Sequence, residues 1–349
     1  MWSVGIMEVE MIKKSEKEPL IEIKNLKKHF DIKRKEKLHA VDDISLQIYP
    51  GETLGLVGES GCGKSTIGNL IMRLLEPTSG EILYQGKNIN GKSGKENRGI
   101  TEKMQIIFQD PYSSLNPKKT VRNILEEPFL VQHIGKTKKE RIFLIDELCE
   151  KVDLNKDLLD YYPHELDGGM RQVVGIARAL SLSAEFIVCD EPVSSLDVSV
   201  QAKIINMLMD LQKQFGLTYL FISHDLSVVK HISDRIAVMY LGQIVEMSDT
   251  ETMFENTLHP YSIALLSAVP KIDFSNDSER IVLKGDVPSP VNPNMNKCRF
   301  AKRCWMAQEC CTQACPPLVE VEPGHKVACF FAKESRERMK DTQKVTKKL

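Results

Sequence analysis

Residues 53–66 read TLGLVGESGCGKST, and this stretch decides the fold. Its first five residues predict a buried strand, and the apolar positions within residues 67–75 predict a helix directly after the loop. The glycine-rich part fits the pattern G-x-x-x-x-G-K-S/T, whose glycines let backbone N–H groups surround phosphates while the helix N-terminus adds positive potential. Lys64 is expected to reach the β- and γ-phosphates, and Ser65 to ligate Mg²⁺. The candidates for nucleotide binding are Gly58, Glu59, Ser60, Gly61, Cys62, Gly63, Lys64, Ser65 and Thr66.

A second apolar run, residues 186–191 (FIVCDE), ends in two acids. This order predicts a strand that places Asp190 near Mg²⁺ and leaves Glu191 to polarise an attacking water. Taken alone, the pair could also be two solvated acids at the end of a strand. The glycine-rich loop favours the catalytic interpretation.

Further strands interleave with helical patterns, which is typical of an α/β fold whose mostly parallel sheet is covered on both faces. The expected strands are residues 21–30, 40–48, 80–84, 104–108, 219–222 and 235–240. The expected organisation is an N-terminal extension (1–18), a nucleotide-binding domain (19–260) with a helical subdomain at about 110–180, a C-terminal module (261–331) and a charged tail (332–349).

Composition excludes several other classes of protein. The 349 residues are 42% hydrophobic and 27% charged, and a net charge of -1 gives no reason to expect a nucleic-acid partner. No run reaches the roughly 18 apolar residues of a membrane-spanning helix, and residues 1–18 lack the features of a secretory signal. We therefore expect a cytoplasmic protein, for which any transport would require separate membrane subunits.

Six ordered motifs resemble those of the ABC-transporter ATPase family. Besides the loop and the acidic pair, they are residues 108–110 (FQD), 166–172 (LDGGMRQ), 195–197 (SLD) and 222–224 (ISH), and the resemblance covers about residues 19–255. It implies a P-loop ATPase with a mostly parallel core, an antiparallel β subdomain and a helical subdomain. It also implies that ATP and Mg²⁺ are bound.

The resemblance assigns roles to individual residues. Gln109 would sense Mg²⁺ together with Ser65 and Asp190 and would contact a membrane subunit. His224 would contact the γ-phosphate and act with Glu191 in catalysis. Phe30 is the candidate that stacks on adenine, although it could also be a packed strand residue, and His39 is its alternative.

The signature motif contacts the nucleotide of the opposite subunit in this family, and here it departs from the usual LSGGQ. Its residues are Asp167, Gly168, Gly169 and Met170, and Asp197 of the following motif would lie at the dimer interface. Asp167 can cap a helix as well as serine does. Set against a γ-phosphate, however, its carboxylate is a like charge. The second interpretation predicts a heterodimer in which the partner supplies a serine signature.

Two longer stretches resemble the oligopeptide and dipeptide importer branch, which also includes nickel carriers. They are residues 109–117 (QDPYSSLNP) and 259–270 (HPYSIALLSAVP), while GCG at 61–63 and EPTSG at 76–80 resemble the second of two paired ATPase subunits. The resemblance implies a subunit that hydrolyses ATP to drive uptake of peptides or a related solute. Its implied partners are a different ATPase subunit, two integral membrane permeases and, indirectly, an extracytoplasmic solute-binding protein, at the cytoplasmic face of the membrane. The solute itself stays open among oligopeptide, dipeptide, nickel complex and sugar.

The C-terminal region concentrates six of the nine cysteines. Five residues separate Cys298 from Cys304, six separate Cys304 from Cys311, and Cys329 closes the run. Four thiols of this kind could bind a 4Fe-4S cluster or Zn²⁺, and the absence of a tight C-x₂-C favours the cluster. Cys310 and Cys315 leave the ligand choice open, and packed cysteines without a metal are the alternative.

Two other functions stay open. One is a soluble ABC ATPase acting on ribosomes or DNA, although such proteins usually carry two fused cassettes or a long coiled-coil insertion. The other is a regulatory ATP-binding subunit with little turnover, which intact Lys64, Asp190, Glu191 and His224 argue against.

Overall fold

The computed structural model describes residues 18–33, 35–91, 95–269, 281–283, 285 and 287–335. Nearly all of the expected N-terminal extension (1–18) and most of the charged tail (332–349) lie outside these residues. The predicted strand of residues 53–57 is β3 (Thr53–Val57), and all five of its residues are buried. It lies inside the main sheet, parallel to strands on both sides.

The main sheet has eight strands in the order β11-β12-β10-β9-β3-β8-β7-β6. From β6 to β9 the strands are parallel, which confirms the predicted mostly parallel core. The last three strands pair antiparallel and were not predicted. The bounds are β6 (Met104–Ile107), β7 (Phe186–Asp190), β8 (Thr218–Ser223), β9 (Arg235–Tyr240), β10 (Gln243–Asp249), β11 (Val319–Glu322) and β12 (His325–Val327).

The two faces of this sheet bury two separate hydrophobic clusters. Successive residues of a strand point to opposite faces, so Ile187 and Cys189 of β7 belong to one cluster, while Phe186 and Val188 belong to the other. Burial on both faces explains why these strands are continuous apolar runs in the sequence. The ends of the parallel strands are therefore rigidly placed.

A second, antiparallel sheet has the order β2-β1-β4-β5. Its strands are β1 (Ile21–Lys33), β2 (Glu36–Ile48), β4 (Ser79–Tyr84) and β5 (Lys87–Asn88). The predicted strands 21–30 and 40–48 thus form the long hairpin of β1 and β2, which extends further than predicted on both sides of the turn.

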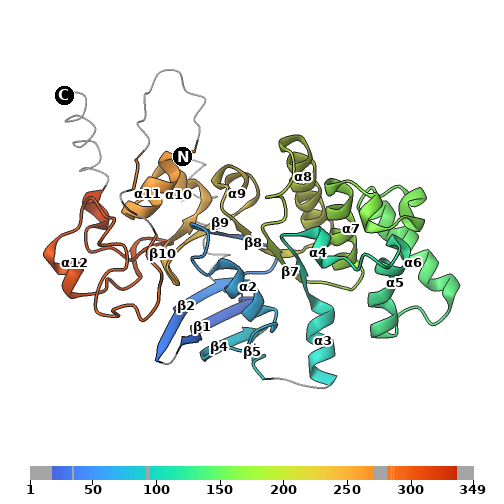
Figure 1. Ribbon diagram of the computed structural model, residues 1–349, viewed down its shortest axis with the longest axis horizontal. Helices are drawn as coiled ribbons and strands as arrows, with labels where there is room; N and C mark the ends of the chain where they lie inside the picture. The colour runs from blue at the N-terminus through green and yellow to red at the C-terminus, as the bar shows by residue number, and fades with distance from the viewer. Residues whose placement is uncertain are drawn as a thin grey trace, which may run out of the picture.

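The helices are distributed unevenly along the molecule (Figure 1). Helices α5, α6 and α7 lie at the end opposite α12. No helix in the described part of the chain is long and apolar enough to cross a membrane. The bounds are α2 (Lys64–Ile71), α3 (Lys95–Lys103), α4 (Pro111–Ser114), α5 (Val121–Gln132), α6 (Lys138–Lys151), α7 (Gly168–Leu180), α8 (Val198–Phe215), α9 (Leu226–Ile232), α10 (Thr250–Glu255), α11 (Pro260–Ser267) and α12 (Glu309–Gln313).

The C-terminal region shares structure with the rest of the chain. Its strand β12 pairs with β10 in the main sheet, with Glu246 opposite Val327. A second junction lies at the β1–β2 hairpin, where Val291 forms a bridge with Leu38 and the His39 N–H donates to the Pro290 carbonyl at 2.9 Å. Residues far apart in sequence therefore meet at the β1–β2 hairpin.

Candidate functional site

The glycine-rich loop runs from the end of β3 into α2, as predicted. Gly58 and Gly63 have φ angles of 154° and 108°, a region that side chains disfavour. A Cβ atom on Gly63 would also lie 2.0 Å from the carbonyl oxygen of Ala40. Glycine is therefore required there both by backbone conformation and by the close approach of β2.

Lys64 is the first residue of α2, and its side chain is buried within the loop. Its Nζ donates to the carbonyl oxygen of Gly58 at 2.8 Å and to that of Glu59 at 3.2 Å. The next residue, Ser65, donates its hydroxyl to Oδ1 of Asp190 at 2.8 Å. A cation and two hard oxygen ligands thus lie side by side, which suits a phosphate chain with Mg²⁺.

The two acids occupy different environments at the end of β7. Burial raises the pKa of Asp190, and the charge of Glu191 adds to this effect, while the hydrogen bond from Ser65 opposes it. Glu191 has a φ of 46°, an uncommon conformation for a side-chain-bearing residue and one that often accompanies functional sites. The chain turns sharply here, so the carboxylates of Asp190 and Glu191 contact different side chains.

Two other predicted side chains meet at the Glu191 carboxylate. Gln109, which follows β6, donates its Nε2 to Oε2 of Glu191 at 3.0 Å. His224, which follows β8, places Nδ1 at 3.2 Å from the same oxygen. Because β6, β7 and β8 are parallel, their carboxyl ends lie at one edge of the sheet, and the motifs that follow them converge.

A cavity of about 550 Å³ joins these groups to the β1–β2 hairpin. Among the predicted residues, it is lined by Phe30, Ser60, Gly61, Gly63, Lys64, Ser65, Thr66, Gln109, Glu191 and His224. Gly58, Glu59, Cys62 and Asp190 are not part of this lining. Leu38, Ala40 and Pro290 line it as well and were not predicted. No local pattern marks Pro290, because it reaches the cavity through pairing across more than 250 residues of sequence.

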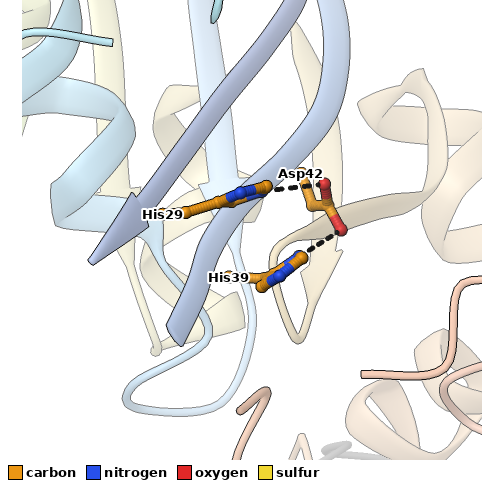
Figure 2. Close-up of side chains that lie close together, drawn as sticks. All are labelled: His29, His39 and Asp42. Carbon is orange, nitrogen blue, oxygen red and sulfur yellow. Dashed lines mark hydrogen bonds and ion pairs between the residues drawn. The ribbon is translucent and has the colours of Figure 1, made fainter. Parts of the chain in front are cut away.

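The hairpin register decides between the two aromatic candidates. Phe30 pairs with Leu38, and both side chains line the cavity. His29 pairs with His39, and both imidazoles point to Asp42 instead, at 3.2 and 3.1 Å (Figure 2). The structure therefore places Phe30, and not His39, in the lining of this cavity.

The signature residues lie away from this cavity, at the start of α7. Asp167 accepts a hydrogen bond from the backbone N–H of Met170 at 2.7 Å, so it caps the helix. Asp167 and Gly168 are exposed, while Gly169 packs against α8. Asp197 is also exposed, at the start of α8. The exposed Asp167, Gly168 and Asp197 are free to face another molecule.

Four cysteines line one small cavity in the C-terminal region: Cys298, Cys304, Cys311 and Cys329. Burial raises the pKa of Cys298 to about 12, and those of Cys304 and Cys329 to about 11. Within the described residues, only His29, His39 and Asp42 form a group of three with all ligand atoms within 4.8 Å of one another. No three of these sulfur atoms therefore all lie within 4.8 Å of one another, whereas the thiolates around one zinc ion lie about 4 Å apart.

Comparison with known proteins shows which family the chain belongs to. The family model described as ABC transporter matches residues 41–194, and that described as oligopeptide/dipeptide transporter, C-terminal region, matches residues 245–311. The oligopeptide transport ATP-binding protein AppF of Bacillus subtilis (strain 168) is 48% identical, over 90% of this chain and 98% of its own length. OppF of the same strain, with the same description, is 50% identical over 90% and 97%.

Solved structures agree with the sequence relatives. The dimeric ATP-binding cassette MJ0796, solved in a post-hydrolysis state with ADP and Pi, is 29% identical with a TM-score of 0.61, covering 66% of this chain and 98% of that one. CbiO1 from Clostridium perfringens, part of an ABC transporter complex, is 26% identical with a TM-score of 0.60, covering 68% and 91%. The chain is therefore an ATPase of the ABC transporter family, and it carries the C-terminal region of the oligopeptide/dipeptide transporters.

Proposed function

We propose that the chain is the ATP-hydrolysing subunit of an ABC importer, driving uptake of peptides or a related small solute through separate membrane subunits. The observation that carries this proposal is the meeting of Gln109, Glu191 and His224 beside Lys64. The names of the peptide-transport relatives and the matching C-terminal region support the solute class.

ATP would lie along the cavity from the hairpin to the acids. Phe30 would stack on the adenine, the backbone of residues 58–66 would hold the phosphates, and the Lys64 ammonium would neutralise them. Ser65, Gln109 and Asp190 would hold Mg²⁺, which offsets phosphate charge when bound. The hydrogen bond between the Ser65 hydroxyl and the Asp190 carboxylate supports this assignment, because it brings the two oxygen groups together.

Hydrolysis would depend on Glu191 as the group that polarises the attacking water. Gln109 and His224 both approach one carboxylate oxygen, Oε2, which fixes the orientation of the other oxygen. His224 is 56% exposed, so it can turn towards a γ-phosphate without unpacking. Roles of this kind fit a turnover-competent site better than a regulatory subunit with little turnover.

A second, different ATPase subunit would complete the site. Asp167, Gly168, Gly169 and Met170 would face the partner's nucleotide, and Asp197 would lie at the interface. The hydrogen bond from Met170 supports the capping role of Asp167, yet an exposed carboxylate near a partner's γ-phosphate would still repel it. A partner with a serine signature would leave the site on this chain's own P-loop intact.

The same proposal places the subunit peripherally at the cytoplasmic face of the membrane, on two integral permeases, with an extracytoplasmic solute-binding protein acting indirectly. Residues 19–260 would be the nucleotide-binding domain and residues 261–331 the C-terminal module. A soluble ABC ATPase on ribosomes or DNA remains the alternative outcome of the test below.

We propose that the four cysteines hold a 4Fe-4S cluster rather than a zinc ion. The four cysteines converge, but they are too far apart for one tetrahedral metal, whereas a cubane attaches its thiolates to four different irons. Cys298, Cys304, Cys311 and Cys329 would be the ligands. The exposed Cys310, and Cys315, which does not line the cavity, would not.

Affinity purification of the tagged chain from detergent-solubilised membranes tests the proposal. We expect a second ATPase and two integral membrane proteins in stoichiometric amounts, with ATP turnover that rises when a peptide-loaded binding protein is added. Purification with ribosomes or nucleic acid, or turnover indifferent to peptides, would contradict it.

A further inference from the structure

One arginine of the C-terminal region reaches into the glycine-rich loop. Arg303 donates its Nη1 to Oε2 of Glu59 at 2.7 Å and its Nη2 to Oε1 at 3.0 Å. This is a two-pronged pair, the strongest geometry for a guanidinium with a carboxylate. The Arg303 side chain is 8% exposed and that of Glu59 25%, so solvent screens the pair only weakly.

Aromatic side chains hold both partners in place. The guanidinium of Arg303 lies over the ring of Tyr240, 6.0 Å from its centroid. Tyr261 packs on Tyr240 at 4.6 Å, and its hydroxyl accepts a hydrogen bond from the backbone N–H of Glu59 at 2.8 Å. Glu59 is therefore fixed through its side chain and its backbone by residues outside the loop.

A neighbouring arginine anchors the same turn. Arg299 pairs with Asp42 and donates to the Leu241 carbonyl, so residues 299–303 are attached to β2 as well as to the loop. Asp42 also accepts from His29 and His39 (Figure 2). These three side chains have the chemistry of metal ligands, but the guanidinium already neutralises Asp42 and would repel a cation. The network instead fixes where Arg303 enters the loop.

The charge of Glu59 needs an explanation, because its loop binds polyphosphate. An unpaired carboxylate there would repel ATP, while the carbonyl of the same residue accepts from Lys64. We propose that Arg303 is a positioning residue for ATP: by neutralising Glu59 and holding its carboxylate, it makes ATP affinity depend on the C-terminal region. This rests on the phosphate-binding role proposed above for residues 58–66.

Equilibrium ATP binding to the full-length chain tests the proposal. Arg303→Gln should raise the Kd for ATP on the order of tenfold, and the loss should shrink between about 50 and 500 mM salt, because salt screens charge repulsion. Lys302→Gln is the matched control, since it removes a positive charge from an exposed neighbour in the same turn. It should leave the Kd within about twofold of wild type.

A rescue experiment separates charge from folding. In Glu59→Gln/Arg303→Gln the repelling carboxylate is gone, so the Kd should return to within about threefold of wild type. Arg303→Lys keeps the charge, so its Kd for ATP should lie between those of wild type and Arg303→Gln. A normal Kd for Arg303→Gln, or a double variant as weak as the single one, would overturn the proposal.

A further variant distinguishes failure of the role proposed for Arg303 from failure of the proposed function. Lys64→Ala should abolish ATP binding if residues 58–66 hold the phosphates. Binding that survives Lys64→Ala would overturn the phosphate-site assignment itself. Loss with Lys64→Ala, together with no effect of Arg303→Gln, would overturn only the role of Arg303.

Discussion

Replacing Asp42 with asparagine should destabilise the whole chain through the attachment of its C-terminal region. Asp42 is 1% exposed and pairs with Arg299, which is 6% exposed. Removing one partner of a buried ion pair leaves the other charge uncompensated and costs about 3 to 5 kcal/mol. The unfolding entropy is about 2.1 cal/mol/K per residue. For 349 residues that unfold as one unit, the melting temperature of the variant should therefore lie about 4 to 7 °C below that of wild type.

The assay is differential scanning calorimetry at neutral pH, with Asp43→Asn as the control. Asp43 is exposed and has a φ of 62°, which asparagine also adopts, so its replacement should cost less than about 0.5 kcal/mol. Asp42→Asn/Arg299→Met should recover part of the loss, because no buried charge then remains unpaired. An Asp42→Asn variant with the same melting temperature as Asp43→Asn would refute the reasoning.

The same pair predicts a pH dependence. Burial alone would raise the pKa of Asp42, but hydrogen bonds from His39 and His29 and the charge of Arg299 outweigh it and hold this pKa below its usual value. The stabilisation is therefore present above about pH 4 and is lost as the pH falls through the lowered pKa. The stability difference between wild type and Asp42→Asn should accordingly shrink in acid. A constant difference would contradict the assignment.

Three further variants test separate parts of the site. Asp167→Ser in the assembled pair should raise ATP turnover or change its cooperativity; unchanged kinetics would favour the capping role alone. Phe30→Ala should raise the Kd for ATP about two- to tenfold through lost stacking, whereas Ile32→Ala, on an exposed part of the same strand, should not. Cys304→Ser should lower the iron content of anaerobically purified protein, while Cys310→Ser should not, and wild type without iron would exclude the cluster.

The parallel core was predictable because its strands are local apolar runs. Because β7 and β8 are buried on both faces, they are continuous apolar runs without alternating polar residues. The glycine-rich loop marks the end of β3. The convergence of Gln109, Glu191 and His224 follows from the same parallel arrangement. Motifs placed after such strands must meet at one edge of the sheet.

The antiparallel extension was not predictable, and β10 shows why. Its sequence, QIVEMSD, contains Glu246, which is fully buried and accepts from the N–H groups of Leu258 and His259 and from His325. A buried charge satisfied by distant residues breaks the alternation that marks a strand. Neither this pairing nor the contact of Arg303 with Glu59 leaves a local signal in the sequence.

The most direct test of the account is turnover by Glu191→Gln in the complex assembled with its partner ATPase and permeases. The variant keeps the size of the side chain and its contact with Gln109 but removes the carboxylate that we propose polarises the attacking water. The account predicts unimpaired ATP binding and at least about a 100-fold slower release of phosphate, with Glu185→Gln, at the opposite end of β7, close to wild type. Wild-type turnover by Glu191→Gln would contradict the assignment of hydrolysis to this site.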